Sequence, residues 1–105
     1  MGAPLTVRHG DLVIDLANYR VLLHEEPLIL TYREYALLVY LAARVGHVVS
    51  RRRLLEEGMG RHDVGGLRMV DEHIRRLKSR LEHNGHVRIE QVDGPEGASY
   101  RFVSE

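Results

Sequence analysis

The clearest hydrophobic pattern in the chain lies between residues 68 and 82. Its apolar residues recur at spacings of four, three and four, at Val70, Ile74, Leu77 and Leu81. These spacings follow the 3.6-residue period of a helix and predict an amphipathic helix over about 68–82 with one buried stripe. At about 100° per residue, the opposite face carries Arg68, Glu72, Arg76 and Ser79, flanked by His73, Arg75 and Arg80.

Two further helices are predicted before it. Thr31 and Glu34 have the spacing of a capping box, in which each side chain accepts a hydrogen bond from the other residue's backbone N–H. The helix that they begin should cover about 32–44, stop near Gly46 and bury Leu37, Leu38, Leu41 and Ala42. Ser50 can cap a second, shorter helix, which ends at residues 58–60 and buries Leu54 and Leu55.

Short strands are predicted on both sides of the helices. Apolar runs at 12–16, 19–23 and 28–30 alternate with turns at 17–18 and 24–27, and Pro27 suits a strand entry. In the tail, polar positions alternate with Val87, Ile89, Tyr100 and Phe102, and the segment 93–97 has turn residues. The order predicts an α+β fold: an antiparallel sheet over 1–30, three helices over 31–82 and a β-hairpin over 83–105.

The size and composition suit one soluble domain covering residues 1–105. No apolar run approaches the roughly 18 residues that a membrane span needs, and the start lacks a secretory signal, so we expect a cytoplasmic protein without membrane contact. The chain has no cysteine, which excludes disulfides and thiolate metal sites. Its seven histidines form no helical His-x-x-x-His pattern, so we expect no metal; His83 and His86, at a turn, are the least implausible pair.

The charge is balanced overall but unevenly distributed. Fifteen basic and 15 acidic residues give a formal net charge of zero, which counts against a DNA binder dominated by electrostatics. The segment from Arg68 to Arg80, however, contains five basic residues and only two acidic ones, and Arg51, Arg52 and Arg53 form a second basic cluster. A neutral protein can therefore still present a basic face.

Two interpretations of the basic face stay open at this point. A helix about 10–12 Å across fits a major groove about 12 Å wide, and arginine suits both guanine and phosphate. Alternatively the face is simply solvated, with Asp71/Arg75 and Glu72/Arg76 as i, i+4 pairs. An enzyme is disfavoured, because the sequence has no nucleophile–base pair, no identifiable carboxylate dyad and no cofactor motif.

Four segments in the right order resemble one known family. They are Leu30-Thr-x-x-Glu-x-x-Leu-Leu38, Val48-Val-Ser-Arg-x-x-Leu-Leu55, Arg68-x-Val-Asp-x-His-Ile-Arg-Arg-Leu77 and Tyr100-Arg-Phe102. Together they make nearly the whole chain similar to the OmpR/PhoB-type winged-helix domain of bacterial two-component response regulators. The resemblance implies a winged helix-turn-helix in a transcription regulator, with the third helix in the major groove and the hairpin as a wing near the backbone or minor groove.

The resemblance and the basic surface together give the expected DNA-binding residues: Arg51, Arg68, Glu72, His73, Arg75, Arg76, Lys78, Arg80, Gln91 and Tyr100. Arg76 is the first choice for a base contact. Several have alternatives. His73 could instead be packed against a partner, and Glu72 could accept from cytosine or pair with Arg76. Tyr100 could pack the wing with its hydroxyl near the backbone, or belong to the core. Lys78 lies close to the buried stripe, although its long stem could reach a phosphate.

The chain also departs from the family's pattern. The wing has Val92-Asp93-Gly94 where Val-Arg-Gly is common, and its turn is about two residues longer. Because an aspartate repels phosphate, the minor-groove contact is absent or moved to Arg88 or Arg101. Met69 replaces the usual threonine, and Met59-Gly60 replaces the usual Trp-Gly.

Partners follow from the same resemblance. Duplex DNA would be bound as direct repeats, with the N-terminal sheet meeting a neighbouring copy, and a receiver domain is absent from this chain. The glycine-rich loop 58–67, with Met59, Arg61 and Asp63, is expected to contact RNA polymerase or to be a plain connector. The alternative function is a winged-helix module that binds protein, favoured by the neutral charge and Asp93 and opposed by the basic third helix.

Overall fold

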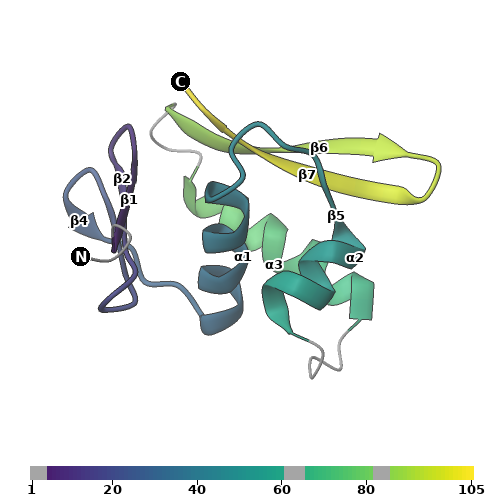
Figure 1. Cartoon of the computed structure of the whole chain (residues 1–105), viewed down its shortest axis with the longest axis horizontal. Helices are drawn as coiled ribbons and strands as arrows, with labels where there is room; N and C mark the ends of the chain where they lie inside the picture. The colour runs from purple at the N-terminus through teal and green to yellow at the C-terminus, as the bar shows by residue number, and fades with distance from the viewer. Residues whose placement is uncertain (1–4, 61–65, 82–85) are drawn as a thin grey trace.

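A small sheet forms one end of the molecule. The computed structural model describes residues 5–60, 66–81 and 86–105, and its first four strands pair antiparallel in chain order. They are β1 (Thr6–His9), β2 (Leu12–Asp15), β3 (Arg20–Leu23) and β4 (Glu26–Pro27). Figure 1 shows this sheet at the left, beside α1. The predicted N-terminal antiparallel sheet is therefore confirmed.

One strand prediction at this sheet was wrong. Residues 28–30 are not a strand; the last strand is the two-residue β4, which ends at Pro27. The Leu28 N–H still donates to the Val21 carbonyl oxygen at 2.8 Å. Ile29 is 75% exposed. Strand pairing therefore ends at Pro27, which lacks a backbone donor for the ladder, and the chain leaves the sheet after the Leu28 bond.

The first helix begins and packs as its sequence predicts. In α1 (Tyr32–Ala42), the Glu34 N–H donates to Thr31 Oγ1 at 3.1 Å and the Thr31 N–H donates to Glu34 Oε1 at 2.9 Å. This capping box satisfies donors that the first turn leaves without helical partners. The predicted stripe of Leu37, Leu38, Leu41 and Ala42 is buried.

The second helix differs from the regular helix that was predicted. Ser50 caps a short α2 (Arg51–Arg53), accepting from the Arg53 N–H at 3.1 Å, and α2 continues as the π-helix η1 (Leu54–Met59). In a π-helix the backbone bonds span five residues. This wider turn brings Leu54, which is buried, and Met59, five residues later, against the same core.

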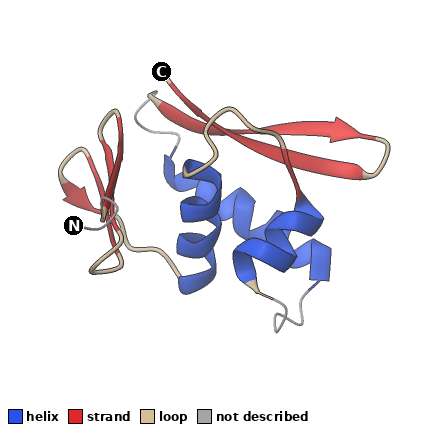
Figure 2. Ribbon diagram, viewed as in Figure 1, coloured by secondary structure: helices blue, strands red, loops and turns tan. Residues whose placement is uncertain are grey.

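The third helix, α3 (Gly66–Leu81), begins two residues earlier than predicted. Its stripe of Val70, Ile74, Leu77 and Leu81 is buried, as the periodicity predicts. Figure 2 shows the helices beside the N-terminal sheet, with the hairpin running above them. Their apolar faces, together with inward residues of β2 and the hairpin, form one hydrophobic cluster.

The hairpin consists of β6 (Val87–Gly94) and β7 (Gly97–Ser104), joined by a two-residue turn at 95–96. The predicted alternation is confirmed, because Val87, Ile89, Tyr100 and Phe102 are buried. The sequence did not reveal β5 (Val49–Ser50), which pairs antiparallel with β7. This third strand attaches the wing to the start of α2.

Candidate nucleic-acid interface

The outer face of α3 is exposed and mostly basic. Its exposed side chains are Arg68, Arg75, Arg76, Ser79 and Arg80. Glu72 forms ion pairs with Arg75 and with Arg76, the latter 3.8 Å from Glu72 Oε2 to Arg76 Nη2. The predicted Glu72/Arg76 pair is therefore present, and it leaves the Arg76 side chain 58% exposed.

A groove separates α3 from the wing. Its volume is about 590 Å³, and it is lined by Arg68, Asp71, Glu72, Ile74, Arg75, Lys78, Gln91, Ala98 and Tyr100. Lys78 is half-buried in this groove, which agrees with its predicted place beside the buried stripe. On the wing side, Gln91 Nε2 donates to Asp93 Oδ1 at 2.7 Å, and both side chains are exposed.

His73 was expected among the DNA-binding residues, and its position contradicts that expectation. It is only 5% exposed, on the buried side of α3. The packed alternative therefore holds, but neither ring nitrogen has a hydrogen-bond partner among the described residues. The helical wheel places His73 at the edge of the outer face, and the packing around α3 extends over that edge.

Tyr100 belongs to the junction of the wing with α3 and not to an open surface. It is 5% exposed, and its hydroxyl donates to Asp71 Oδ1 at 2.8 Å, not to the backbone as expected. Burial raises the pKa of Tyr100 well above its usual value, and the hydrogen bond to Asp71 raises it further. The hydroxyl therefore stays protonated and acts as a donor.

Two other expected DNA-binding residues already have protein partners. Arg51 Nη1 lies 2.7 Å from Asp71 Oδ2, so the predicted local pair of Asp71 with Arg75 is replaced by a tertiary one. Arg80 Nη1 donates to the Ile29 carbonyl oxygen at 2.6 Å, which ties the end of α3 to the segment before α1. Arg80 remains exposed.

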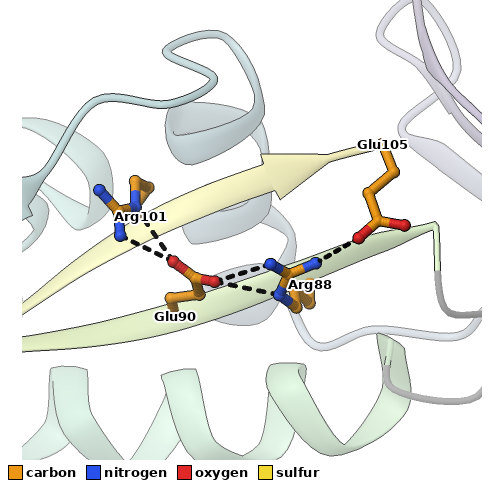
Figure 3. Close-up of polar contacts among 4 residues, drawn as sticks. All are labelled: Arg88, Glu90, Arg101 and Glu105. Atoms are coloured by element: carbon orange, nitrogen blue, oxygen red, sulfur yellow. Dashed lines mark hydrogen bonds and ion pairs between the residues drawn. The ribbon is translucent and has the colours of Figure 1, made fainter.

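The outer face of the wing carries a neutralised charge network (Figure 3). Arg101 Nη2 and Arg88 Nη2 each lie 2.8 Å from an oxygen of Glu90, and Arg88 also binds Glu105 at 3.0 Å. Hydrogen bonds from Arg101, and to a smaller extent from Arg88, hold the pKa of the Glu90 carboxyl below its usual value. Both arginines that could have replaced the missing wing arginine are thus engaged with carboxylates. The sequence could have indicated this ion pair, because Arg88 and Glu90 are two residues apart and alternate residues of a strand share a face.

The remaining predicted sites are only partly covered by the structure. Met59 lies in η1 and packs against the core instead of standing in an open loop. Arg61, Asp63 and His83 lie outside the described residues. Within the described parts of the chain, no group of three His, Asp or Glu residues could hold a metal ion, and no helix has the length and apolarity to cross a membrane.

Comparisons with known proteins agree on one family. The family model described as "Transcriptional regulatory protein, C terminal" matches residues 25–102. The phosphate regulon transcriptional regulatory protein PhoB of Klebsiella pneumoniae is 37% identical over 102 residues, which cover 97% of this chain and 44% of PhoB. The chain therefore spans less than half the length of this relative.

Two solved structures of similar size extend the comparison. The DNA-binding domain of CpxR from E. coli matches with a TM-score of 0.77 and 28% identity, covering 97% of this chain and 98% of that one. The DNA-binding domain of K. pneumoniae RstA, crystallised in complex with the RstA box, has a TM-score of 0.72 and 30% identity, covering 93% and 96%.

Proposed function

Because the chain belongs to the family of C-terminal domains of transcriptional regulatory proteins, the OmpR/PhoB-type effector domains of response regulators, we propose that it binds duplex DNA sequence-specifically. The observation that carries the proposal is the exposed basic face of α3, whose diameter suits the major groove. The RstA domain, which has the same fold, was crystallised with its DNA box. A cytoplasmic location follows from this function, since bacterial DNA lies there.

The basic residues of α3, and Gln91 on the wing, have distinct proposed roles. Arg76 reads a base, because it lies near the middle of the face and its ion pair with Glu72 is long. Arg68 and Arg75 contact bases or phosphates beside it, while Lys78 and Arg80 contact phosphates. Gln91 approaches from the wing, across the groove. Phosphate contacts set affinity and register, and base contacts set sequence preference.

Selection from random duplexes tests this proposal. The chain is incubated with a random pool at a fixed salt concentration, and affinities for the selected and scrambled duplexes are then measured over a salt series. We expect a preference of about a thousandfold or more, the low end for specific binders. Salt-dependent binding without enrichment of any sequence would contradict specific recognition.

A second candidate is a winged-helix module that binds another protein. It is favoured by the zero net charge of the chain and by the acidic residue Asp93 beside the groove. The same selection separates the two candidates, because a protein-binding module would enrich no duplex. Contact with RNA polymerase through the region of Met59, Arg61 and Asp63 remains a further prediction, and a receiver domain, which this chain does not contain, remains a predicted partner.

We predict that the chain is monomeric in dilute solution and occupies two half-sites arranged as direct repeats on DNA. Its sequence has no coiled-coil heptads that would hold a dimer, and the N-terminal sheet is proposed to meet the neighbouring copy on DNA. Sedimentation velocity with one-site and two-site duplexes measures both states. A tight dimer without DNA, or only one copy on two direct half-sites, would contradict the prediction.

Replacing Asp93 by arginine is expected to tighten binding to any duplex about tenfold at low salt. Repulsion between one carboxylate and a phosphate at roughly 6–8 Å is on the order of 0.5 kcal/mol in water, and the substitution both removes it and adds a cation. It also frees Gln91 from its 2.7 Å bond to Asp93. The gain should shrink as salt rises, and preference for A·T-rich flanks should increase.

Glu26→Arg, measured on a one-site duplex so that no neighbouring copy meets the N-terminal sheet, is the matched control. It makes the same charge change at an exposed residue of β4, at the end of the molecule away from the wing tip (Figure 1). It should tighten binding much less than Asp93→Arg. Equal gains for the two variants would mean that net charge alone acts. An Asp93→Arg variant with unchanged affinity and salt dependence would place the wing away from DNA.

A further inference from the structure

One carboxylate joins three elements of the structure at the floor of the groove. Asp71, on α3, accepts from Tyr100 of β7 through Oδ1 at 2.8 Å and from Arg51 of α2 through Oδ2 at 2.7 Å. Each oxygen therefore has a donor from a different element. Hydrogen bonds to a charged acceptor are stronger than neutral ones and fix direction as well as distance.

Arg51 is confined from its other side by the wing. A Cβ placed on Gly97 would lie 2.8 Å from Arg51 Nη2 and 3.2 Å from Arg51 Cζ, closer than side chains normally approach. Gly97 also has a φ of +107°, which an L side chain rarely adopts. The guanidinium thus fits between the Asp71 carboxylate and the backbone of the wing, with its Nε buried.

This arrangement removes a positive charge from the proposed DNA surface. The side chains of Arg51 and Asp71 are 28% and 33% exposed, so the pair is partly open to solvent beside two cavities. A guanidinium paired in this way contributes no net charge there. An unpaired arginine at the same place could bind a phosphate of any duplex, because phosphate contacts carry no sequence information.

We propose that Asp71 is a positioning residue for DNA recognition: it fixes α3 relative to the wing through Tyr100, and it holds Arg51 away from phosphate, so that binding depends on the bases that α3 reads. This inference rests on the proposed DNA-binding function. It assigns a role to a residue that the sequence pattern indicates only as a local partner of Arg75.

The test is Asp71→Asn in the complete chain, measured on the selected and scrambled duplexes over a salt series. Asparagine can still accept from Tyr100, but it leaves Arg51 without its counterion. We expect tighter binding to the scrambled duplex and a log–log salt slope steeper by about 0.9, the value for one added phosphate contact. The preference for the selected duplex should fall about tenfold, since one charged hydrogen bond that fixed the geometry is lost. A purely structural role would weaken binding to both duplexes and leave the slope unsteepened.

Three further variants complete the experiment. Arg51→Gln added to Asp71→Asn should return the slope to that of the unmodified chain. Glu96→Gln removes one negative charge at an exposed residue that lines a cavity with Arg51, so it controls for net charge. Tyr100→Phe keeps the ring and removes only the hydroxyl, so preference should fall at constant slope. It also provides the test if Asp71→Asn does not fold.

The outcomes separate this inference from the function on which it rests. If the unmodified chain prefers no duplex, both the proposed sequence-specific DNA binding and the role of Asp71 are wrong. An unmodified chain that discriminates, with Asp71→Asn matching Glu96→Gln in slope and preference, overturns the role of Asp71 alone. Unchanged preference in Tyr100→Phe also overturns it, because the link between α3 and the wing would then have no effect on recognition.

Discussion

Replacing Arg76 by alanine is expected to weaken binding to the selected duplex by about 1–3 kcal/mol and to relax the preference at one base pair. The Arg76 side chain is 58% exposed, and the carboxylate oxygen of its partner Glu72 lies 3.8 Å away. An exposed ion pair of this kind contributes about 1 kcal/mol or less, so Arg76 can leave it for a base at little cost. When Arg76 moves to a base, the Glu72 carboxylate still has Arg75 as an ion-pair partner.

The comparison that tests this role uses two classes of variant on matched and scrambled duplexes. Lys78→Ala and Arg80→Ala should weaken binding to both duplexes similarly and flatten the salt slope, as loss of a phosphate contact does. Arg20→Ala, in β3 of the N-terminal sheet, removes the same charge as Arg76→Ala without touching α3. It is measured on a one-site duplex, where no neighbouring copy meets that sheet. If Arg76→Ala weakened both duplexes equally, Arg76 would be a phosphate contact and another residue would read the base.

Features set by local periodicity or by short-range hydrogen bonds were predictable from the sequence. The stripe from Val70 to Leu81 and the inward residues of the hairpin repeat with the periods of a helix and a strand, and both are buried as predicted. The capping box of Thr31 and Glu34 depends only on residues three apart, and both of its hydrogen bonds are present. In these cases the spacing of residues along the chain determines which side chains share a face or form a hydrogen bond.

Features that depend on tertiary contacts were missed. The strand β5 has only two residues, too few to show an alternation, and forms because β7 offers a free edge. The spacing of Asp71 and Arg75, one helical turn apart, predicted a local ion pair. The donors to the two oxygens of Asp71 are instead Arg51, 20 residues earlier in the chain, and Tyr100, 29 residues later. His73 lies at the edge of the helical wheel, where the surrounding packing, not the period, decides burial.

The proposed interface was therefore predicted in outline and corrected in its details. The exposed arginines of α3 are where the wheel placed them, because a helix fixes which residues share a face. The residues with changed roles, Arg51, His73 and Tyr100, all lie where α3 meets another element. The wing arginines Arg88 and Arg101 are neutralised through the cross-strand register of the hairpin, which pairs Glu90 with Arg101.

The largest effect on stability is expected for Phe102→Ala, which should lower the free energy of unfolding by about 3–5 kcal/mol. Phe102 is fully buried on β7, the central strand between β5 and β6. Its ring centroid lies 5.2 Å from that of His9, and its carbonyl oxygen accepts from the Gly46 N–H at 2.9 Å. Removing the ring leaves a cavity where the wing, the helices and the N-terminal sheet meet.

Equilibrium urea unfolding, followed by circular dichroism, measures this loss. Because small domains are stable by only about 5–15 kcal/mol, the variant should also melt about 12 °C or more below the unmodified chain. Val103→Ala is the control, since the neighbouring residue of β7 is only partly buried and should cost about 1 kcal/mol or less. DNA binding by Phe102→Ala should fall in parallel with its folded fraction, because the substitution touches no residue of the α3 face. A loss of stability as small as that of Val103→Ala would mean that the wing is not anchored to the helices through Phe102.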